Sequence, residues 1–175
     1  SDAVTVVEAE ITSDEDWTAP LPNADMVVSC LASRSGAPAD ARLVEYEANR
    51  RLLAYAERAA VQHFLLLSAI CVQIPRLAFQ REKLKFEALL AESSVPATII
   101  RATAFFRSLV GQVERVRLGK PFLLFSSGNL TACKPISDRD LARFMVSKLA
   151  SPPSATAVLA IGGPGPALTP QDQGR

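Results

Sequence analysis

The sequence is poor in side chains that bind metal ions. Its 175 residues include one histidine, His63, and three cysteines, Cys30, Cys71 and Cys133. The cysteines lie far apart and lack the short spacing of zinc or iron–sulfur ligands, so no metal site is expected from them. Unpaired thiols are typical of proteins in a reducing compartment. His63 precedes an apolar run, and we expect it to have a structural role.

Long apolar runs and a strong excess of one charge are also absent. No run approaches the roughly 18 apolar residues of a membrane-spanning helix. The 19 basic and 18 acidic side chains are interspersed and give a net charge of +1, which argues against binding to nucleic acids or to an anionic membrane surface. Small molecules or proteins are therefore the expected partners. The first residues, SDAVTVVEAEI, are acidic and resemble no signal or transit peptide, which indicates the cytosol unless the chain starts after such a segment.

Four apolar runs predict strands, and three of them are continuous rather than alternating. Continuous runs are typical of strands that are buried on both faces, as in parallel sheets. Helical periodicity separates the runs in residues 39–60 and 79–93. Strands that alternate with helices predict right-handed crossovers and an α/β fold with a Rossmann-like, doubly wound parallel sheet. The predicted strands are residues 4–11, 25–32, 63–70 and 97–103.

After Arg101 the pattern predicts shorter and more varied elements. We expect a helix, then two short strands around an SSGN turn, a second helix, a further strand, and a loop that ends in the start of a helix. Ser137 and Asp140 form a capping-box pattern at the start of the second helix. In order, these elements are residues 103–119, 121–133, 137–150, 157–163 and 164–175. The apolar content of 49% is sufficient for the core of one domain over residues 1–175.

Glycine is missing where a dinucleotide site needs it. A doubly wound sheet that binds a dinucleotide has a glycine-rich turn after its first strand, which lets the backbone approach the pyrophosphate. None of the eight glycines directly follows residues 4–11, and the first one is Gly36. Either no dinucleotide binds, or the phosphate-binding half lies upstream of Ser1.

A lysine lies within an apolar helix face in the stretch FQREKLKFE, residues 79–87. Helical spacing puts Lys83 on the same stripe as Phe79, Phe86 and Leu90. Because a buried ammonium group is costly unless it is paired, this position requires an explanation. One interpretation is that Lys83 reaches the helix edge and pairs with Glu87, one turn later. The other is that Lys83 faces a cleft and donates hydrogen bonds to the hydroxyls of a ligand.

The order of three segments, LLLSAI, FQREK and IIRATAFF, resembles the atypical short-chain dehydrogenases/reductases. In that family a serine at a strand end and a Tyr-x-x-x-Lys pair on the next helix form the active site. Ser68 and Lys83 match this pattern, and Phe79 stands where the tyrosine is expected. The resemblance is more specific in longer strings, which are similar to the NADPH-type 3,8-divinyl chlorophyllide 8-vinyl reductases over residues 4–175. These strings are HFLLLSAICVQ, FQREKLKFEALL, TAFFRSLVGQVERV, GKPFLLF, LTACKPIS and IGGPGPALTPQDQG.

This resemblance implies an oxidoreductase of chlorophyll biosynthesis that acts on a CH–CH group. The implied reaction is the NADPH-dependent reduction of the 8-vinyl group of divinyl chlorophyllide or protochlorophyllide, a tetrapyrrole, to ethyl. Phe79 has no phenol that could stabilise an oxyanion, but the reduction of a conjugated vinyl group forms none. The alternative is a non-catalytic, NmrA-like protein that binds NADP(H) as a sensor or as a subunit of a complex. The implied compartment is the chloroplast in a plastid-bearing eukaryote and the cytoplasm in a phototrophic bacterium.

Members of that family begin with a glycine-rich strand–turn–helix and continue past LTPQDQG. The resemblance therefore implies an internal fragment that is inactive alone. Residues 1–175 would form a partial NAD(P)-binding domain, in which residues 121–175 lead into the substrate-binding portion.

The resemblance also carries site residues over to this sequence. Glu10 and Ile11 match a pair near the adenine, and Ala32, Ser33 and Arg34 follow the strand at 25–32. Ser68 would lie beside the nicotinamide, and Lys83 would bind the hydroxyls of the nicotinamide ribose. Ala102, Thr103, Ala104 and Phe105 would line the nicotinamide side.

Three of these assignments have structural alternatives. Arg34 could be a solvated loop charge, and Ser68 could simply cap the next turn. Phe105 and Phe106 could offer a flat apolar wall to a macrocycle or be core residues.

Overall fold

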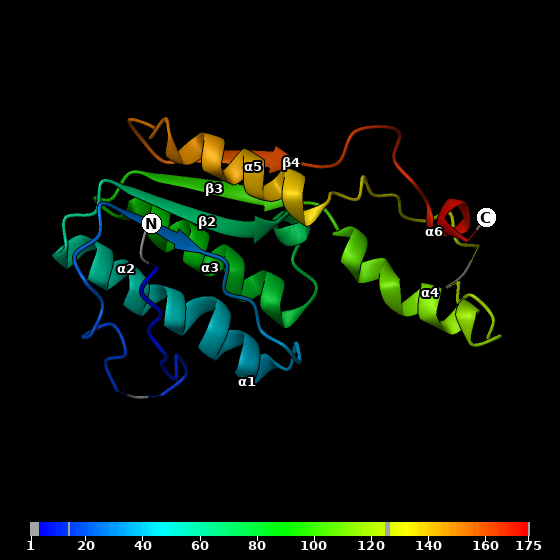
Figure 1. Ribbon diagram of the computed structural model, residues 1–175, viewed down its shortest axis with the longest axis horizontal. Coiled ribbons are helices and arrows are strands. Elements are labelled where there is room, and N and C mark those ends of the chain that lie inside the picture. Colours follow the sequence, from blue (N-terminus) through cyan, green and yellow to red (C-terminus); the bar gives the residue numbers. More distant parts are fainter. Residues whose placement is uncertain (1–3, 14, 125–126, 175) are drawn as a thin grey trace.

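The computed structural model describes residues 4–13, 15–124 and 127–174, and its centre is a four-stranded parallel sheet (Figure 1). The strands are β1 (Met26–Ser29), β2 (His63–Ala69), β3 (Ala97–Ala102) and β4 (Ala157–Ile161), and they lie in the order β1-β2-β3-β4. All three pairings are parallel, and Ser68 of β2 lies opposite Arg101 of β3. The prediction of an α/β fold with a parallel sheet is confirmed.

Helices follow each of the first two strands. A continuous helix made of α1 (Pro38–Ala41), the π-helical segment η1 (Arg42–Ala48) and α2 (Asn49–Arg58) joins β1 to β2. A 3-10 turn, η2 (Ile70–Gln73), and the helix α3 (Ala78–Glu92) join β2 to β3. These bounds confirm the helices predicted over 39–60 and 79–93.

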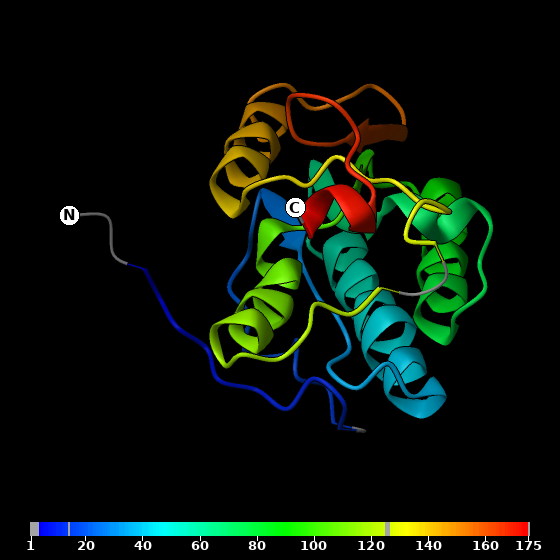
Figure 2. The ribbon, with the colours of Figure 1, turned by 90° about the vertical axis from the view of Figure 1, so that its right-hand side faces the viewer.

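The connection from β3 to β4 is longer. It contains the 3-10 turn η3 (Phe106–Leu109) and the helices α4 (Val110–Arg117) and α5 (Asp138–Leu149). The short helix α6 (Pro170–Gln173) follows β4, and α4 and α6 lie beyond the carboxyl ends of the strands (Figures 1 and 2). Ser137 caps α5 as predicted, because its hydroxyl accepts a hydrogen bond from the Asp140 amide at 3.0 Å.

Each face of the sheet packs against its own set of helices, because successive side chains of a strand point to opposite faces. On one face Phe64 and Leu66 of β2 join the core formed with α2 and α3, where the Phe64 and Phe86 ring centroids lie 6.0 Å apart. On the other face Leu65 of β2 and Ile100 of β3 pack against α5 (Figure 1). The strands follow one another across the sheet in chain order, but α5 lies on the face opposite to α2 and α3. The connection from β3 to β4 through α5 therefore has the opposite hand to the connections through α2 and α3.

Two strand predictions are wrong. Residues 4–11 form no strand, and Val4 and Val6 are 87% and 85% exposed. Their backbone has no ladder partner among the described residues, and Figure 2 shows this segment leading away from the sheet. An apolar run becomes a strand only where another strand pairs with it. The described residues of 121–133 also form no strand, since their ladder bonding is limited to one isolated bridge between Cys133 and Leu168. Phe125 and Ser126, at the predicted SSGN turn, lie outside the described residues.

Two further observations concern the whole of the described chain. Gly36, which has a φ of +69°, is the one glycine between β1 and α1. No helix in the described ranges is both long and apolar enough to cross a bilayer.

Candidate functional site

A cavity of about 460 Å³ lies at the carboxyl ends of β1, β2 and β3. Ligands of open α/β sheets bind at this edge, because the loops that leave the strands surround it. The cavity is mostly apolar, with a few polar groups at its wall. Its lining residues are Cys30, Leu31, Ala32, Leu67, Ser68, Ala69, Ile70, Cys71, Phe79, Lys83, Ala102, Thr103, Ala104, Phe105, Ser108 and Cys133.

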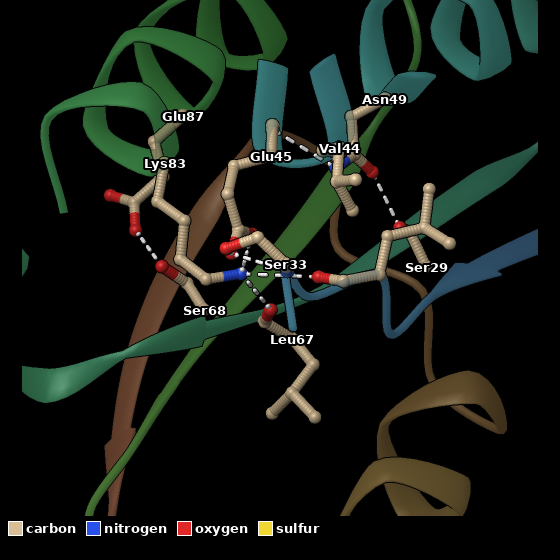
Figure 3. A network of polar contacts seen from close by, with 10 residues as sticks. Ser29, Ser33, Val44, Glu45, Asn49, Leu67, Ser68, Lys83 and Glu87 are labelled. Carbon is tan, nitrogen blue, oxygen red and sulfur yellow. Dashed lines mark hydrogen bonds and ion pairs between the residues drawn. The ribbon is translucent and has the colours of Figure 1, made fainter. Parts of the chain in front are cut away.

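Lys83 reaches this cavity from α3, and its partner is a carboxylate on a different helix. Its Nζ lies 2.7 Å from Glu45 Oε2, and the two side chains are 10% and 2% exposed. The same ammonium group donates to the carbonyl oxygens of Leu31 at 3.3 Å and Leu67 at 3.5 Å. Lys83 thus joins α3 to η1, to the loop after β1 and to the carboxyl end of β2 (Figure 3). The interpretation in which Lys83 pairs with Glu87 is wrong.

Glu45 occupies its position because the helix widens there. In the π-helical segment η1 the side chain of Asn49 supplies hydrogen bonds to two backbone carbonyls: its Nδ2 donates to Glu45 O at 3.0 Å and to Val44 O at 3.2 Å. Ser29 Oγ in turn donates to Asn49 Oδ1 at 2.5 Å, which fixes the helix against β1 (Figure 3). The Oε1 atom of Glu45 accepts hydrogen bonds from Ser33 N at 3.0 Å and Ser33 Oγ at 3.1 Å.

A second buried carboxylate lies on the next turn of α3. Glu87 accepts a hydrogen bond of 2.5 Å from Ser68 Oγ, and its Oε2 lies 2.5 Å from Arg101 Nη2. Arg101 Nε also donates to Glu87 Oε2, at 3.1 Å, so two nitrogens of the guanidinium bind the Glu87 carboxylate. Ser68 is therefore held by a charged partner, and does not cap the turn that follows β2: no capping hydrogen bond from a side chain is found at η2.

The opposite side of the cavity is formed by the chain that leaves β3. Thr103 N donates to Ile161 O at 2.9 Å, and Thr103 Oγ1 donates to Lys134 O at 2.6 Å. Phe105 forms an isolated bridge with Ile136, and Ile136 N donates to Ala104 O at 3.0 Å. This segment is positioned mainly by its backbone.

All three cysteines line the same cavity, although they lie far apart in the sequence. Cys30 and Cys71 are exposed and Cys133 is half-buried. Burial raises the pKa of the Cys30 thiol, and the nearby Lys83 opposes this shift. Within the described ranges no group of three or more histidine, cysteine, aspartate or glutamate side chains could hold a metal ion.

The structure brings together seven of the eleven predicted site residues. Those that line the cavity are Ala32, Ser68, Lys83, Ala102, Thr103, Ala104 and Phe105. Ser33 lies just behind the wall, bonded to Glu45. Arg34 is an exposed loop residue that does not line the cavity.

Glu10 and Ile11 do not reach the cavity either. They lie in the N-terminal segment, where Glu10 bonds to the neighbouring Thr12 and the hydroxyl of Thr12 holds the Glu10 pKa below its usual range. His63 lies at the start of β2, far along the strand from Ser68. It is fully buried, its Nε2 lies 2.9 Å from Thr98 Oγ1, and burial lowers its pKa.

Sequence reasoning missed Glu45, Asn49 and Arg101. Glu45 lies in a run of charged helix residues, LVEYEANRR, which carries no sign that one of its carboxylates is buried. Arg101 gave a weak signal, because it is a charge at the end of an otherwise apolar strand.

Comparison with known proteins identifies the type of domain. Residues 1–152 match the family described as NAD(P)H-binding. The chain belongs to the NAD(P)H-binding family. Solved structures with a similar fold include UDP-glucuronic acid 4-epimerase from Bacillus cereus in complex with NAD, with a TM-score of 0.78 and 16% identity over 94% of this chain and 61% of that one. The UDP-glucose 4-epimerase from Thermotoga maritima has a TM-score of 0.79 and 17% identity over 95% of this chain and 64% of that one. At this identity the likeness shows the fold alone.

More similar sequences are found among plant proteins. The chain is 53% identical over 155 residues to a divinyl chlorophyllide a 8-vinyl-reductase, chloroplastic, from Cucumis sativus, and 52% identical over 156 residues to the protein of that name from Arabidopsis thaliana. The alignments cover 86% of this chain and 37% of each relative. The chain thus spans little more than a third of the length of these relatives.

Proposed function

We propose that the protein is an NADPH-dependent reductase of the 8-vinyl group of divinyl chlorophyllide, acting in the chloroplast. The observation that supports this most is the cavity itself, an apolar space at the nucleotide-binding edge of an NAD(P)H-binding domain, with Lys83 and Ser68 in its wall. The sequence identity of 53% and 52% to plant relatives that are named for this reaction supports divinyl chlorophyllide as the substrate. In this proposal residues 1–175 form part of the NAD(P)-binding domain, and residues 121–175 lead into the substrate-binding portion.

The donor groups of the cavity fit a nicotinamide nucleotide. Lys83 would hold the ribose hydroxyls, because an ammonium group donates to two oxygens of a diol without a change of shape. Ser68 and the segment from Ala102 to Phe105 would border the nicotinamide ring. Ala32 would lie along the ribose, supported from behind by Ser33. When bound, NADPH supplies the hydride for the reduction.

Phe79 is compatible with the reduction of an alkene. It lines the cavity one helical turn before Lys83, and its ring cannot donate a proton to an oxyanion. In the proposed reaction hydride adds to the vinyl group, the negative charge spreads into the tetrapyrrole ring, and a proton from water or from a side chain completes the ethyl group. The protein therefore needs no phenol at this position. The site contributes mainly the orientation of cofactor and substrate and the electrostatics around the cofactor.

The test is an absorbance assay with the protein in its full natural length. With divinyl chlorophyllide and NADPH, we expect the Soret and red bands to shift to those of the monovinyl product, and NADH to support a much lower rate. Lys83→Met should abolish the shift. Lys85→Met is the matched control, because Lys85 is 60% exposed and pairs with Glu82 on the same helix.

Binding of NADPH without any shift of the pigment bands would contradict the proposal. That result would favour a non-catalytic sensor or a subunit of a larger complex.

A further inference from the structure

We propose that Glu45 is the positioning residue of this site: its buried carboxylate fixes the ammonium group of Lys83 at the cavity wall, where it meets the hydroxyls of a nicotinamide nucleotide. This inference rests on the cofactor site of the proposed function and does not depend on the pigment. Glu45 itself does not line the cavity, so it acts through Lys83.

The contacts of Lys83 differ in strength. Three oxygens surround Lys83 Nζ: two carbonyl oxygens accept its hydrogen bonds, and Glu45 Oε2 forms an ion pair with it. The Glu45 carboxylate, at 2.7 Å, is both the nearest and the charged one. The Leu31 and Leu67 carbonyls, at 3.3 Å and 3.5 Å, are at the long limit of a hydrogen bond. A ligand hydroxyl can therefore replace a carbonyl as the partner of Lys83, while the Glu45 contact remains.

Glu45 is held more rigidly than an ordinary ion-pair partner. Its side chain is 2% exposed, and it lies on the π-helical segment that Asn49 and Ser29 fix against β1. One carboxylate oxygen faces Lys83 and the other accepts from the amide and hydroxyl of Ser33. The same carboxylate thus orders both the lysine and the loop after β1, which contributes Ala32 to the cavity.

The neighbouring acids have other partners. Glu87 is bonded to Ser68 and Arg101, and Glu47 pairs with Arg50 on the outside of the helix. Loss of Glu45 would therefore leave Lys83 with neutral acceptors only, in a position where an unpaired charge is costly.

The experiment measures NADPH affinity by fluorescence titration in the absence of pigment, using the protein in its full natural length. Glu45→Gln removes the charge and keeps the shape. We expect its Kd for NADPH to rise roughly 10–100-fold, which is the loss seen when a group that orients a metal-binding side chain is removed. Glu47→Gln, two residues away on the same segment, should leave the Kd unchanged. Glu45→Asp, which keeps the charge on a shorter side chain, should restore part of the affinity.

A double-mutant cycle separates positioning from general damage to the fold. If Glu45 acts through Lys83, Glu45→Gln should cause no further loss of affinity in a Lys83→Met background. Thermal melts of all variants show which are folded. Lys83→Met alone leaves the buried Glu45 carboxylate without its ion-pair partner, whereas the double variant removes both charges. The double variant should therefore have the higher melting temperature.

The outcomes distinguish this inference from the proposed function. A Glu45→Gln variant that binds NADPH like the wild type would overturn the inference even if the pigment is reduced. Additive losses in the cycle would also overturn it. If the wild type binds NADPH but reduces no pigment, the proposed reaction fails, while the expected loss of NADPH affinity in Glu45→Gln would still support the role of Glu45.

Discussion

The two sides of the cavity are built in different ways. The side formed by β1, β2 and α3, here called the ion-paired wall, contains Ser68 and Lys83, and each of these residues contacts a buried carboxylate. The side formed by residues 102–108 and Cys133, here called the β3 wall, has no such pair. Its hydrogen bonds run mainly through the backbone and Thr103, and Cys133 Sγ accepts one from Gln173 Nε2 at 3.7 Å.

This contrast suggests that the two walls have different roles in binding. A buried ion pair adds little net stability but fixes the geometry of its members, because a charge without its partner is costly in the interior. The ion-paired wall is therefore suited to hold polar groups of one fixed ligand. In the β3 wall Phe105 lines the cavity, whereas Phe106 is 52% exposed and does not line it. We propose that Phe105 offers apolar surface to the ring of the substrate.

Loss of a buried carboxylate should have the largest effect on the ion-paired wall. Glu87→Ala leaves the Arg101 guanidinium without its partner, and we expect the free energy of unfolding to fall by about 3–5 kcal/mol. The measurement is denaturant unfolding of the protein in its full natural length. Glu114→Ala is the control, because the exposed pair of Glu114 and Arg117 should contribute only about 0–1 kcal/mol. Equal losses in the two variants would remove the distinction between buried and surface pairs.

Lys83→Ala should affect cofactor binding next most strongly. A hydrogen bond to a charged group contributes about 1.5–3 kcal/mol, so the KM for NADPH should rise about tenfold or more, or activity should be lost. Steady-state kinetics with varied NADPH measures this effect. Unaltered kinetics would exclude Lys83 from the site.

A smaller and purely steric effect is expected behind the β3 wall. A Cβ atom on Gly163 would lie 1.9 Å from Pro135 O, so Gly163→Ala must displace the backbone that supports Ala104. We expect a loss of about 1–3 kcal/mol in the free energy of unfolding, as for other overpacked sites. Gly111→Ala, with no atom within 4 Å of the new Cβ, should instead stabilise α4 by about 0.5–1 kcal/mol. A free energy of unfolding unchanged by Gly163→Ala would show that the backbone behind this wall can move without cost.

The smallest effect is expected from Phe79→Tyr. The added hydroxyl lies at the cavity but has no oxyanion to stabilise, so the rate of vinyl reduction should remain close to that of the wild type. Rate measurements with divinyl chlorophyllide test this. A rate that depends strongly on the new hydroxyl would contradict the proposed charge distribution.

The fold was largely predictable, because its strands are continuous apolar runs and its helices have clear periodicity. The strand predicted at 4–11 was wrong, because the apolar content of a run does not reveal whether a neighbouring strand is present to pair with it. The site was predictable only in part. Ser68 and Lys83 came from a family resemblance, and helical spacing suggested Glu87 as the partner of Lys83. The actual partner, Glu45, lies on another helix, and periodicity within one element carries no information about such a contact.

The most direct test of the account is isotope transfer. The protein in its full natural length is incubated with divinyl chlorophyllide and NADPH that carries deuterium at C4 of the nicotinamide, prepared separately with each of the two C4 stereochemistries. Mass spectrometry of the pigment should find one deuterium in the new 8-ethyl group with one of the two cofactors, and much less labelled product with the Lys83→Ala variant at an NADPH concentration near the KM of the wild type. An 8-ethyl product without deuterium from either cofactor, or no product at all, would contradict the account.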